Sequence, residues 1–587
     1  MKKQRLLPYR QAVPAIWLFQ LISCLVLQLW MFGYSKISML LINSTGRVAV
    51  TSGDFKFLFT TWQGVLLILI TLLTLFLFVG LNINSLIILS KRLLTGEKPS
   101  VLLCIKEGFL SIKRILNPVG LLVVLFISLF APIIGFGIMI SLTQEFYIPK
   151  FISSVIWSNP LYSVGMVVVI AALFAVGLLF AFILHGAVLD GIPLSKSAGN
   201  SLKLVRRNLK KYIFELFRFF ITLVIIFVIS VVVVVGVLFL VFLLPVSQDV
   251  MIPLSVALLS TLFFVLVMMI MMVTPFFILK LTSLYLTFKS NGEWSYEKRK
   301  KRKSPVVIAT ASVLVLSVAS LTVLVSIFYD IIFPNTVTTG YIAHRAGGYE
   351  APENTVAGLE AAYKLNASGG EIDIQRTSDG KYVVNHDADF SRVAGVNKKP
   401  SEMTLEEVKQ LRVDGEPVPT FEEMLEASKD KLTLYVELKG ETADLQMAED
   451  AVKTIKDYNM IDGAVVISLK YDLIDYIETN YPEIQTGYLA FASFGDTESL
   501  NCDYLALEEE VVTDELIGRI HNKGKKLLIW TVNEDDDISD YIQCGADELI
   551  TDNVSGAKRI TEEIEEASPM LRIINGMLRL FSRYHIF

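Results

Sequence analysis

Cysteine and histidine are both scarce in this 587-residue sequence, which has four of the first and five of the second. The four cysteines show neither paired spacing nor metal-ligand spacing, so the sequence does not favour a disulfide framework. Cysteine usage therefore leaves the compartment of the protein open. Each of the five histidines is a candidate catalytic residue, because histidine is the usual general acid or base near neutral pH.

Acidic residues are scarce in one half of the chain only. Residues 1–340 hold 10 Asp and Glu against 29 Lys and Arg, a net charge of +19, whereas residues 341–587 hold 48 against 24, a net charge of −24. The basic residues of the first half stand in short loops beside apolar runs, so we expect no nucleic-acid partner. The pattern indicates a basic membrane half joined to an acidic soluble half.

Seven apolar runs in the first half are long enough to cross a bilayer, which takes about 20 helical residues. They are 13–35, 62–90, 119–142, 161–188, 213–245, 251–279 and 305–333. The first run lacks a small-residue cleavage site, so we expect a membrane span there and not a signal peptide. We expect this half to be an anchor, and a flippase-like or lipid-presenting role stays open.

Basic clusters precede the first of these runs and follow the second, fourth and sixth. Because basic loops stay in the cytoplasm, this alternation predicts a multi-pass protein of the plasma membrane. An odd number of spans then places residues 334–587 on the extracytoplasmic side.

The second half alternates short apolar runs with segments of helical period. The predicted strands are 341–344, 370–376, 432–439, 464–468, 485–490, 503–507, 526–532 and 547–551. The predicted helices are 355–366, 404–411, 421–428, 443–458, 471–479, 513–523 and 535–543. Eight strands alternating with helices over about 225 residues predict a parallel α/β fold of the (β/α)8, or TIM barrel, type.

Residues 341–387 contain most of the candidate catalytic and metal-binding residues. Side chains alternate along a strand, so Glu371 and Asp373 share one face of their strand. Two carboxylates side by side repel, and a hard divalent cation with oxygen ligands resolves that repulsion. His344-Arg345 and His386 bracket this pair in the sequence. A metal, two proton carriers and an arginine predict chemistry on a phosphate.

Other polar residues are predicted to join them at the carboxyl ends of the strands, where barrels of this type carry their active sites. Glu437 and Lys439 share a strand face and supply a third carboxylate and a cation for the phosphate. Trp530 also stands near the end of a strand. Asp552-Asn553 follows the last strand. The sequence is equally compatible with a role of these two residues in the site and with a role in a turn or helix cap.

The segments HRAGGYEAPENT, EIDIQ, NHDADFSRVAGV, YVELK and IWTVN resemble those of the glycerophosphodiester phosphodiesterase family. The resemblance covers about residues 340–560, and the membrane half resembles the multispan domain attached to some Gram-positive members. It implies a TIM barrel and one divalent cation, Mg²⁺ or Ca²⁺. The family usually has glycine after the His-Arg pair, where this chain has Ala346, so the loop there is expected to differ.

The resemblance also implies a role for each site residue. Glu371, Asp373 and Glu437 are expected to bind the metal, and His344 and His386 are expected to act as the acid–base pair. The residues expected to contact or support the substrate are Arg345, Lys439, Trp530, Glu353 and Asn354.

These observations predict three segments: a membrane domain over 1–335, a barrel over 336–565 and a basic-apolar helix over 566–587 that suits the outer leaflet. The predicted function is a membrane-anchored, metal-dependent phosphodiesterase acting on glycerophospholipid head groups or polyglycerophosphate such as lipoteichoic acid. Two alternatives stay open. One is a phospholipase D-like or sphingomyelinase D-like activity on lysolipids, and the other is a non-enzymatic protein that binds or transports glycerophosphate polymers.

Overall fold

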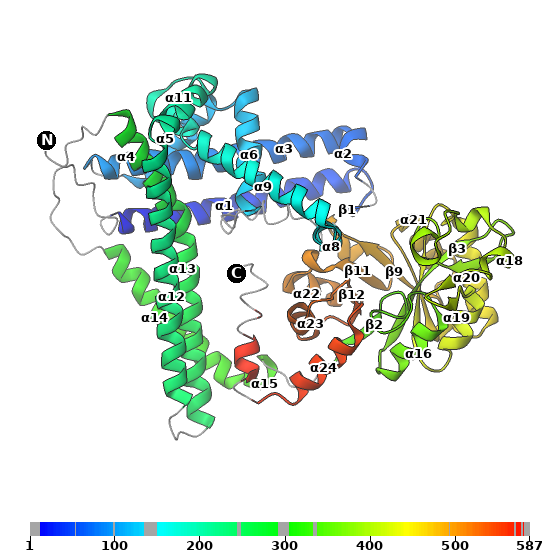
Figure 1. Ribbon diagram of the computed structural model, residues 1–587. Helices are drawn as coiled ribbons and strands as arrows, with labels where there is room; N and C mark the ends of the chain where they lie inside the picture. The colour runs from blue at the N-terminus through cyan, green and yellow to red at the C-terminus, as the bar shows by residue number, and fades with distance from the viewer. Residues whose placement is uncertain are drawn as a thin grey trace.

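The computed structural model contains a helical half, coloured blue to green in Figure 1, and a barrel that begins near residue 340. The structure describes residues 12–52, 55–97, 100–133, 150–242, 248–290, 305–332, 337–491, 493–568, 571–576 and 579.

The helical half consists of long apolar helices joined by short connections. Its described helices are α1 (Val13–Asn43), α2 (Phe57–Thr60), α3 (Trp62–Phe78), α4 (Ser85–Leu94), α5 (Val101–Ser111), α6 (Pro118–Ile133), α8 (Lys150–Ser158), α9 (Pro160–Phe180), α10 (Ile183–Asp190), α11 (Leu194–Arg207), α12 (Leu209–Phe242), α13 (Gln248–Lys289), α14 (Pro305–Ile327) and α15 (Tyr329–Ile332). A π-helical turn, Val79–Asn84, joins α3 to α4.

Among the described residues, five helices are long and apolar enough to cross a membrane, and they coincide with five of the predicted spans. Two shorter apolar helices, Pro118–Ser128 and Val315–Val325, fall within the other two predicted spans. The prediction of a polytopic helical membrane domain is therefore confirmed, with five to seven spans. Residues 134–142, 243–245 and 333 of the predicted spans, the basic residues before residue 12 and the basic run 298–303 lie outside the described residues.

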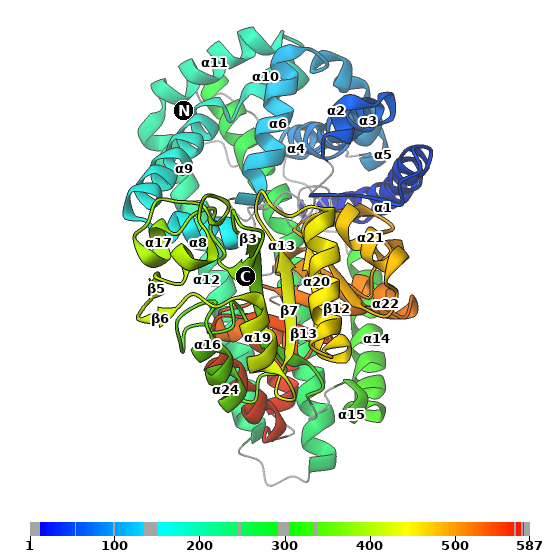
Figure 2. The same ribbon diagram turned by 90° about the vertical axis from the view of Figure 1, so that its right-hand side faces the viewer.

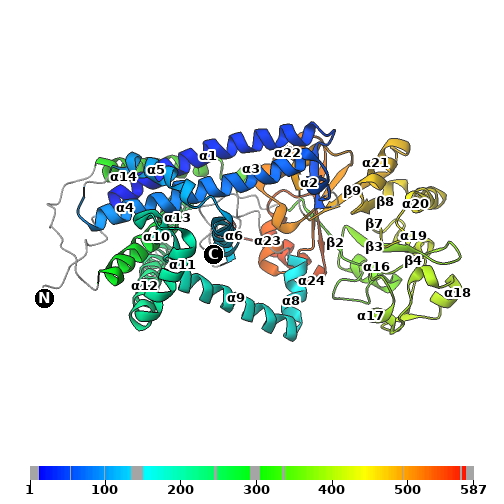
Figure 3. The same cartoon turned by 90° about the horizontal axis from the view of Figure 1, so that it is seen from above.

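Some of these helices end close to the barrel and others end away from it. Figures 1 and 3 show α2 and α8 on the side of the barrel, and α4, α5 and α11 on the side away from it. The latter helices carry basic residues such as Lys91, Lys113 and Arg206 in their last turns or just beyond them. The basic ends of the membrane helices and the barrel therefore lie on opposite sides.

The second half closes into a barrel of eight parallel strands. These are β2 (Gly340–Ala343), β3 (Gly369–Arg376), β7 (Thr433–Leu438), β8 (Ala464–Ser468), β9 (Gln485–Ala490), β11 (Tyr504–Glu508), β12 (Lys526–Trp530) and β13 (Glu548–Thr551). They pair in the order β2-β13-β12-β11-β9-β8-β7-β3, and the pairing of β2 with β3 closes the ring. The predicted TIM barrel is confirmed, with all eight strands within two residues of their predicted bounds.

Five shorter described strands lie outside the eight-stranded ring. β4 (Tyr382–Val384) pairs antiparallel with β3, and β5 (Arg412–Val413) pairs with β6 (Glu416–Pro417). A separate two-stranded sheet joins β1 (Ala49–Thr51) of the helical half to β10 (Ser493–Gly495) of the barrel half.

Helices follow the strands, most of them packed on the outside of the barrel and the short α17 (Ser391–Ala394) and α18 (Leu405–Val408) in the segment after β4. The others are α16 (Val356–Lys364), α19 (Phe421–Ser428), α20 (Leu445–Asp457), α21 (Tyr471–Asn480), α22 (Asp514–Asn522), α23 (Asp535–Ile542) and α24 (Val554–Glu565). Side-chain oxygens accept hydrogen bonds at several helix starts, as Thr355 does for α16 and Asp444 for α20. α17 and α24 were not predicted, although the buried Ala557, Ile560 and Ile564 recur in α24 at helical spacing.

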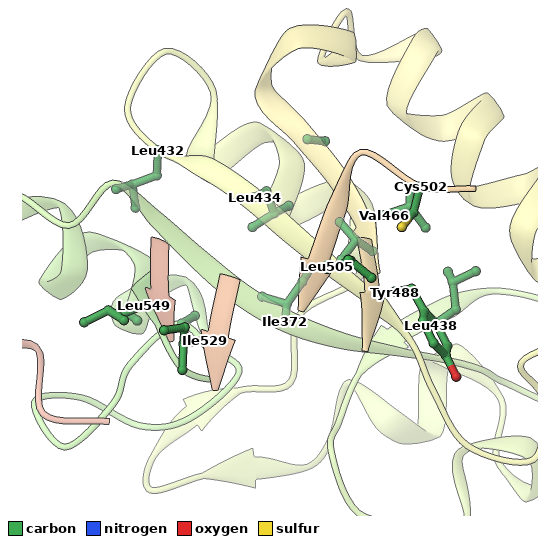
Figure 4. Packing of buried hydrophobic residues seen from close by; sticks show 14 of the residues in the cluster. Ile372, Leu432, Leu434, Leu438, Val466, Tyr488, Cys502, Leu505, Ile529 and Leu549 are labelled. Atoms are coloured by element: carbon green, nitrogen blue, oxygen red, sulfur yellow. The ribbon is translucent and has the colours of Figure 1, made fainter. Parts of the chain in front are cut away.

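Alternation along the strands builds two separate cores. Ile372, Leu434 and Val466 point outward and pack between the strands and the helices, as Figure 4 shows. The opposite faces fill the barrel interior with a smaller cluster that includes Ile342, Tyr435, Val465, Leu489, Tyr504, Leu528 and Ile550. Side chains therefore fill the interior of the barrel, and the site lies at the carboxyl ends of the strands. In Figure 2 this end of the barrel is turned toward the membrane helices.

The last segment contacts the membrane helices, and its position at the outer leaflet stays a prediction. Residues 571–576 are helical, and Ile573 is fully buried against Val256, Leu259 and Val325 of α13 and α14. Residues 569–570, 577–578 and 580–587 of the predicted helix 566–587 lie outside the described residues.

Candidate active site

Three buried carboxylates gather at the mouth of the barrel, the end at which the parallel strands finish. Glu371 and Asp373 belong to β3, and Glu437 of the neighbouring β7 is the register partner of Asp373. Their side chains each offer one oxygen, and these oxygens lie within 4.8 Å of one another. Three buried negative charges at this spacing are unfavourable unless positive charge balances them.

Lys439, which follows β7, supplies part of that positive charge. Its Nζ lies 2.9 Å from Asp373 Oδ1 and 2.9 Å from Glu437 Oε2. Burial acts to raise the pKa of Asp373, but the charges of Lys439 and His386 and the hydrogen bond from Asn354 together outweigh burial and lower that pKa. Burial, together with the charges of Asp373 and Glu437, raises the pKa of Glu371 well above its usual value. Burial likewise raises the pKa of Glu437 to about 7.

This donor set fits a divalent cation. One ammonium group does not balance three carboxylates, and the pKa values of Glu371 and Glu437 are raised by burial together with the neighbouring negative charges. Asp373 Oδ1 is buried and accepts no hydrogen bond within the described part of the chain, although Lys439 is close enough to form an ion pair with it. Mg²⁺ and Ca²⁺ both prefer oxygen ligands of this kind. Glu371, Asp373 and Glu437 are the residues that can hold such an ion.

The loop between β2 and α16 orients the carboxylates. The Arg345 backbone N–H donates to Glu371 Oε2 at 2.8 Å, and Asn354 Nδ2 donates to Asp373 Oδ2 at 2.9 Å. Arg345, Ala346 and Asn354 have φ values of 50°, 63° and 56°, so three residues with side chains occupy the left-handed region. Such strain is common where a loop must present groups to a ligand.

Ala346 stands where glycine was expected from the resemblance, and the backbone there adopts a conformation that favours glycine. The side chain is fully buried and packs in the outer core. The loop keeps its shape with alanine, at the cost of backbone strain.

His344 is the first of two histidines that an aspartate holds in place. It follows β2, and its Nδ1 lies 2.7 Å from Asp552 Oδ1. Asn533 Nδ2 in turn donates to Asp552 Oδ2 at 2.7 Å. Burial acts to raise the pKa of Asp552, but the hydrogen bond and charge of His344, together with the hydrogen bond from Asn533, outweigh burial, and that pKa is lowered. With Nδ1 engaged by a carboxylate, Nε2 is the nitrogen that can exchange a proton with a substrate.

His386 has the same arrangement in the loop that follows β4. Its Nδ1 lies 2.9 Å from Asp387 Oδ1, and Arg392 Nε donates to Asp387 Oδ2 at 2.6 Å. Burial lowers the pKa of His386, and the charge of Asp373 opposes this effect. The neutral form of the imidazole is therefore the one that burial favours.

A chain of ion pairs connects this second pair to the phosphate-binding candidates. Arg392 donates two hydrogen bonds to Glu353, at 2.6 and 2.7 Å, and Glu353 also pairs with Arg345 Nη1 at 3.3 Å. Arg345 Nε is buried and has no hydrogen-bond partner among the residues that the structure describes. A half-buried guanidinium with a donor to spare is suited to an anionic ligand.

Trp530 closes the set of predicted residues. It ends β12, is half-buried, packs against the interior cluster and donates from Nε1 to the Ala506 carbonyl at 2.9 Å. All ten residues predicted for the site thus lie at the mouth of the barrel or in the loops that follow its strands. Sequence reasoning had treated Asp552 only as an open candidate, and it missed the supporting roles of Asp387, Arg392 and Asn533.

The missed residues had weak signals in the sequence. Asp387 directly follows His386, but an adjacent carboxylate is common on surfaces. Asn533 and Asp552 meet across 19 residues of chain, and Arg392 reaches Glu353 across 39. Only the closed barrel brings such partners together.

Comparison with known families agrees with this geometry. Residues 9–323 match the family described as "Membrane domain of glycerophosphoryl diester phosphodiesterase", and residues 344–555 match the "Glycerophosphoryl diester phosphodiesterase family". Together the two matches cover both halves of the chain.

Individual relatives match the barrel half. A glycerophosphodiester phosphodiesterase of Caldanaerobacter subterraneus is 30% identical over 231 residues, which are 36% of this chain and 93% of the relative. One of Bacillus altitudinis is 25% identical over 39% of this chain and 100% of its own length. Among solved structures, an Oleispira antarctica phosphodiesterase in complex with the product sn-glycerol-3-phosphate is 26% identical with a TM-score of 0.36, covering 38% of this chain and 97% of that one.

Proposed function

Because the chain belongs to the glycerophosphoryl diester phosphodiesterase family, we propose that its barrel hydrolyses glycerophosphodiesters with one divalent cation held by Glu371, Asp373 and Glu437. The observation that carries the proposal is the convergence of this carboxylate cluster and two His–Asp pairs at one barrel mouth. The products are glycerol 3-phosphate and the alcohol of the head group.

The histidines supply the proton transfers. One accepts the proton of the attacking oxygen, which belongs either to water or to a neighbouring glycerol hydroxyl that forms a cyclic intermediate. The other protonates the departing alkoxide, which is otherwise a poor leaving group. Asp552 and Asp387 hold both rings by Nδ1, so each ring presents Nε2 to the substrate.

Positive groups stabilise the charge that builds up on the phosphoryl oxygens. Arg345 has an unused buried donor, and Lys439 carries its ammonium at the same cluster. A bound divalent cation acts there as a Lewis acid that neutralises phosphoryl charge. Glu353 and Asn354 keep Arg345 and Asp373 in position, and Trp530 forms part of the apolar wall against the substrate.

The proposal includes a location. The barrel belongs on the extracytoplasmic side of the plasma membrane, because it lies opposite the basic helix ends that the positive-inside rule keeps in the cytoplasm. The substrates within reach there are glycerophospholipid head groups, free glycerophosphodiesters and polyglycerophosphates such as lipoteichoic acid. Nucleic acid is not among them, since the barrel half is acidic.

The test uses the purified full chain with glycerophosphocholine as substrate, with and without chelator. We expect release of glycerol 3-phosphate, its loss after chelation and its recovery with Mg²⁺ or Ca²⁺. Turnover that survives chelation overturns the metal assignment. Turnover of lysolipid alone favours the phospholipase D-like alternative, and binding without turnover of any substrate favours the non-enzymatic one.

Cation binding also has a readout that does not depend on turnover. Neutralising three mutually repelling carboxylates favours the folded state, so Mg²⁺ or Ca²⁺ should raise the Tm of the wild-type chain. Glu371→Gln combined with Asp373→Asn should remove that rise. A Tm rise of equal size in this variant places the cation elsewhere.

A further inference from the structure

The helical half and the barrel are joined by a sheet as well as by the chain itself. β1 and β10 pair antiparallel, with Ala49 opposite Gly495 and Thr51 opposite Ser493. The Asp496 N–H extends the pairing by donating to the Val48 carbonyl at 3.0 Å. These strands are more than 440 residues apart in the sequence, so the contact belongs to the tertiary fold and not to a local turn.

A buried hydrogen bond and a close approach of the two backbones at a glycine stabilise this junction. Thr51 Oγ1 and Tyr488 Oη are hydrogen-bonded at 2.5 Å, and both residues are buried. Gly495 has a φ of 116°, and a Cβ added there would lie 2.8 Å from the Val48 carbonyl oxygen and 2.9 Å from Ala49 Cα. Only glycine allows the two backbones to approach this closely.

On the barrel, the junction lies at the mouth. β9 ends at Ala490 and β10 follows within a few residues, so β10 stands at the same end of the barrel as the carboxylate cluster. Figures 1 and 2 show this end turned toward the membrane helices.

On the helical half, the junction lies beside exposed aromatic side chains. β1 directly precedes α2 and α3, on which Phe59 and Trp62 are 75% and 68% exposed. Trp157 and Tyr162, at the α8–α9 connection, are 55% and 54% exposed, also on the side facing the barrel. Exposed tryptophan and tyrosine at the ends of apolar helices mark the level of the membrane–water interface.

Further contacts restrict the barrel on another side. Ile573, beyond α24, is buried against α13 and α14, and the Arg572 guanidinium lies 4.8 Å from the centre of the Tyr329 ring. Together with the short connection from α15 to β2, this gives three points of attachment. A barrel held at three points cannot turn its mouth freely toward bulk solvent.

We propose that the β1–β10 junction holds the mouth of the barrel at the membrane surface, so that the enzyme takes its phosphodiester from an amphiphile whose acyl chain remains in the bilayer. This inference rests on the proposed phosphodiesterase function. It assigns segment 48–52 of the helical half a positioning role: the segment presents the site to a lipid surface.

The experiment compares two substrates that differ only in an acyl chain: glycerophosphocholine in solution and lysophosphatidylcholine in phosphatidylglycerol nanodiscs that hold the full chain. In both, water adds to phosphorus and the bond to choline breaks, so choline release is the common readout. Gly495→Val breaks the junction by steric conflict, and Thr51→Val removes its buried hydrogen bond. Gly524→Val is the matched control. Gly524 also has a positive φ, of 71°, but no atom of the described residues lies within 4 Å of an added Cβ.

We expect Gly495→Val to lower lysophosphatidylcholine turnover at least tenfold and Thr51→Val to lower it less, with glycerophosphocholine turnover within twofold of wild type in both. Gly524→Val should change neither. If both junction variants keep wild-type turnover of the lipid, or lose both substrates equally, the inference is overturned while the proposed function stands. If the wild-type chain turns over neither substrate, the proposed function itself is overturned, and this inference with it.

Discussion

Each histidine at the barrel mouth has a carboxylate on Nδ1, and each carboxylate has a second partner that holds it. His344, Asp552 and Asn533 form one such series, and His386, Asp387 and Arg392 form the other. A ring held in this way keeps one tautomer and one orientation, which is what proton transfer requires.

Replacing either histidine should therefore affect the chemical step more than binding. We expect His344→Ala and His386→Ala each to lower kcat by about 10²–10⁴-fold, the usual effect of losing a general acid or base. Asp552→Asn should lower kcat less than His344→Ala, because the imidazole remains. Steady-state kinetics with glycerophosphocholine measure both parameters.

His521→Ala is the matched control for these variants, since His521 also pairs with an aspartate, Asp547, at 2.8 Å, but on α22 away from the mouth. It should leave kcat unchanged. A rise in KM with kcat intact in the His344 or His386 variant would recast that histidine as a binding group.

Backbone strain at Ala346 gives a second test at this scale. Its φ of 63° costs an L-residue roughly 1–2 kcal/mol, and glycine avoids that cost. Ala346→Gly should therefore raise the free energy of unfolding by about 1 kcal/mol, after allowance for the flexibility of glycine in the unfolded chain. Ala362→Gly, inside α16, should lower it by about 1 kcal/mol or more. Thermal unfolding of the full chain in detergent measures both changes. If the two substitutions changed the free energy of unfolding in the same direction, the strain argument would be contradicted.

At the scale of elements, the two ends of a barrel strand differ in function: the carboxyl end carries site residues, and the amino end contributes to stability. β13 begins at Glu548, on the closed side, and is followed by Asp552, at the mouth. Glu548 Oε2 accepts a hydrogen bond from Ser368 Oγ at 2.6 Å. Burial raises the pKa of Glu548 to about 7.

This raised pKa predicts a pH dependence of stability. A carboxyl group that is harder to ionise in the folded state than in the unfolded state favours folding at low pH. That contribution is fully present below about pH 4.5 and is lost as the pH rises through about 7. Glu548→Gln should remove the loss, which is on the order of 1–3 kcal/mol.

The measurement is the Tm of the full chain at pH 5 and pH 8. The variant should be more stable than wild type at pH 8, with a smaller difference at pH 5. Glu563→Gln, on the exposed face of α24, is the control and should follow the wild-type curve. A pH dependence identical in wild type and Glu548→Gln would show that another group is responsible.

At the scale of the whole molecule, the separation of charge predicts which side the barrel faces. Cysteine introduced by Ser391→Cys, on an exposed residue of the barrel, should react in intact, wall-stripped cells with a thiol reagent that cannot cross membranes. Lys196→Cys, on an exposed residue of α11 at the opposite side, should react only after lysis. The wild-type chain, whose cysteines are buried or half-buried, provides the background. Labelling in the reverse order would put the barrel in the cytoplasm.

The sequence alone determined the fold class, most element bounds and the main residues that gather at the barrel mouth. Apolar length predicts membrane helices, and alternation predicts strands, because both depend on neighbouring residues. The same alternation put Glu371 and Asp373 on one face, where the structure has them. The order of the motifs then indicated the family, which the comparisons show.

Tertiary structure alone decided which distant groups meet. Asp552 reaches His344 only because β13 pairs with β2 to close the barrel, and Arg392 reaches Glu353 only because two mouth loops lie side by side. The junction of Ala49–Thr51 with Ser493–Gly495 is of the same kind, since a three-residue strand has too little pattern to reveal a partner more than 440 residues away. Local sequence fixes periodicity and propensity, whereas these contacts depend on chain closure over long distances, which no local pattern encodes.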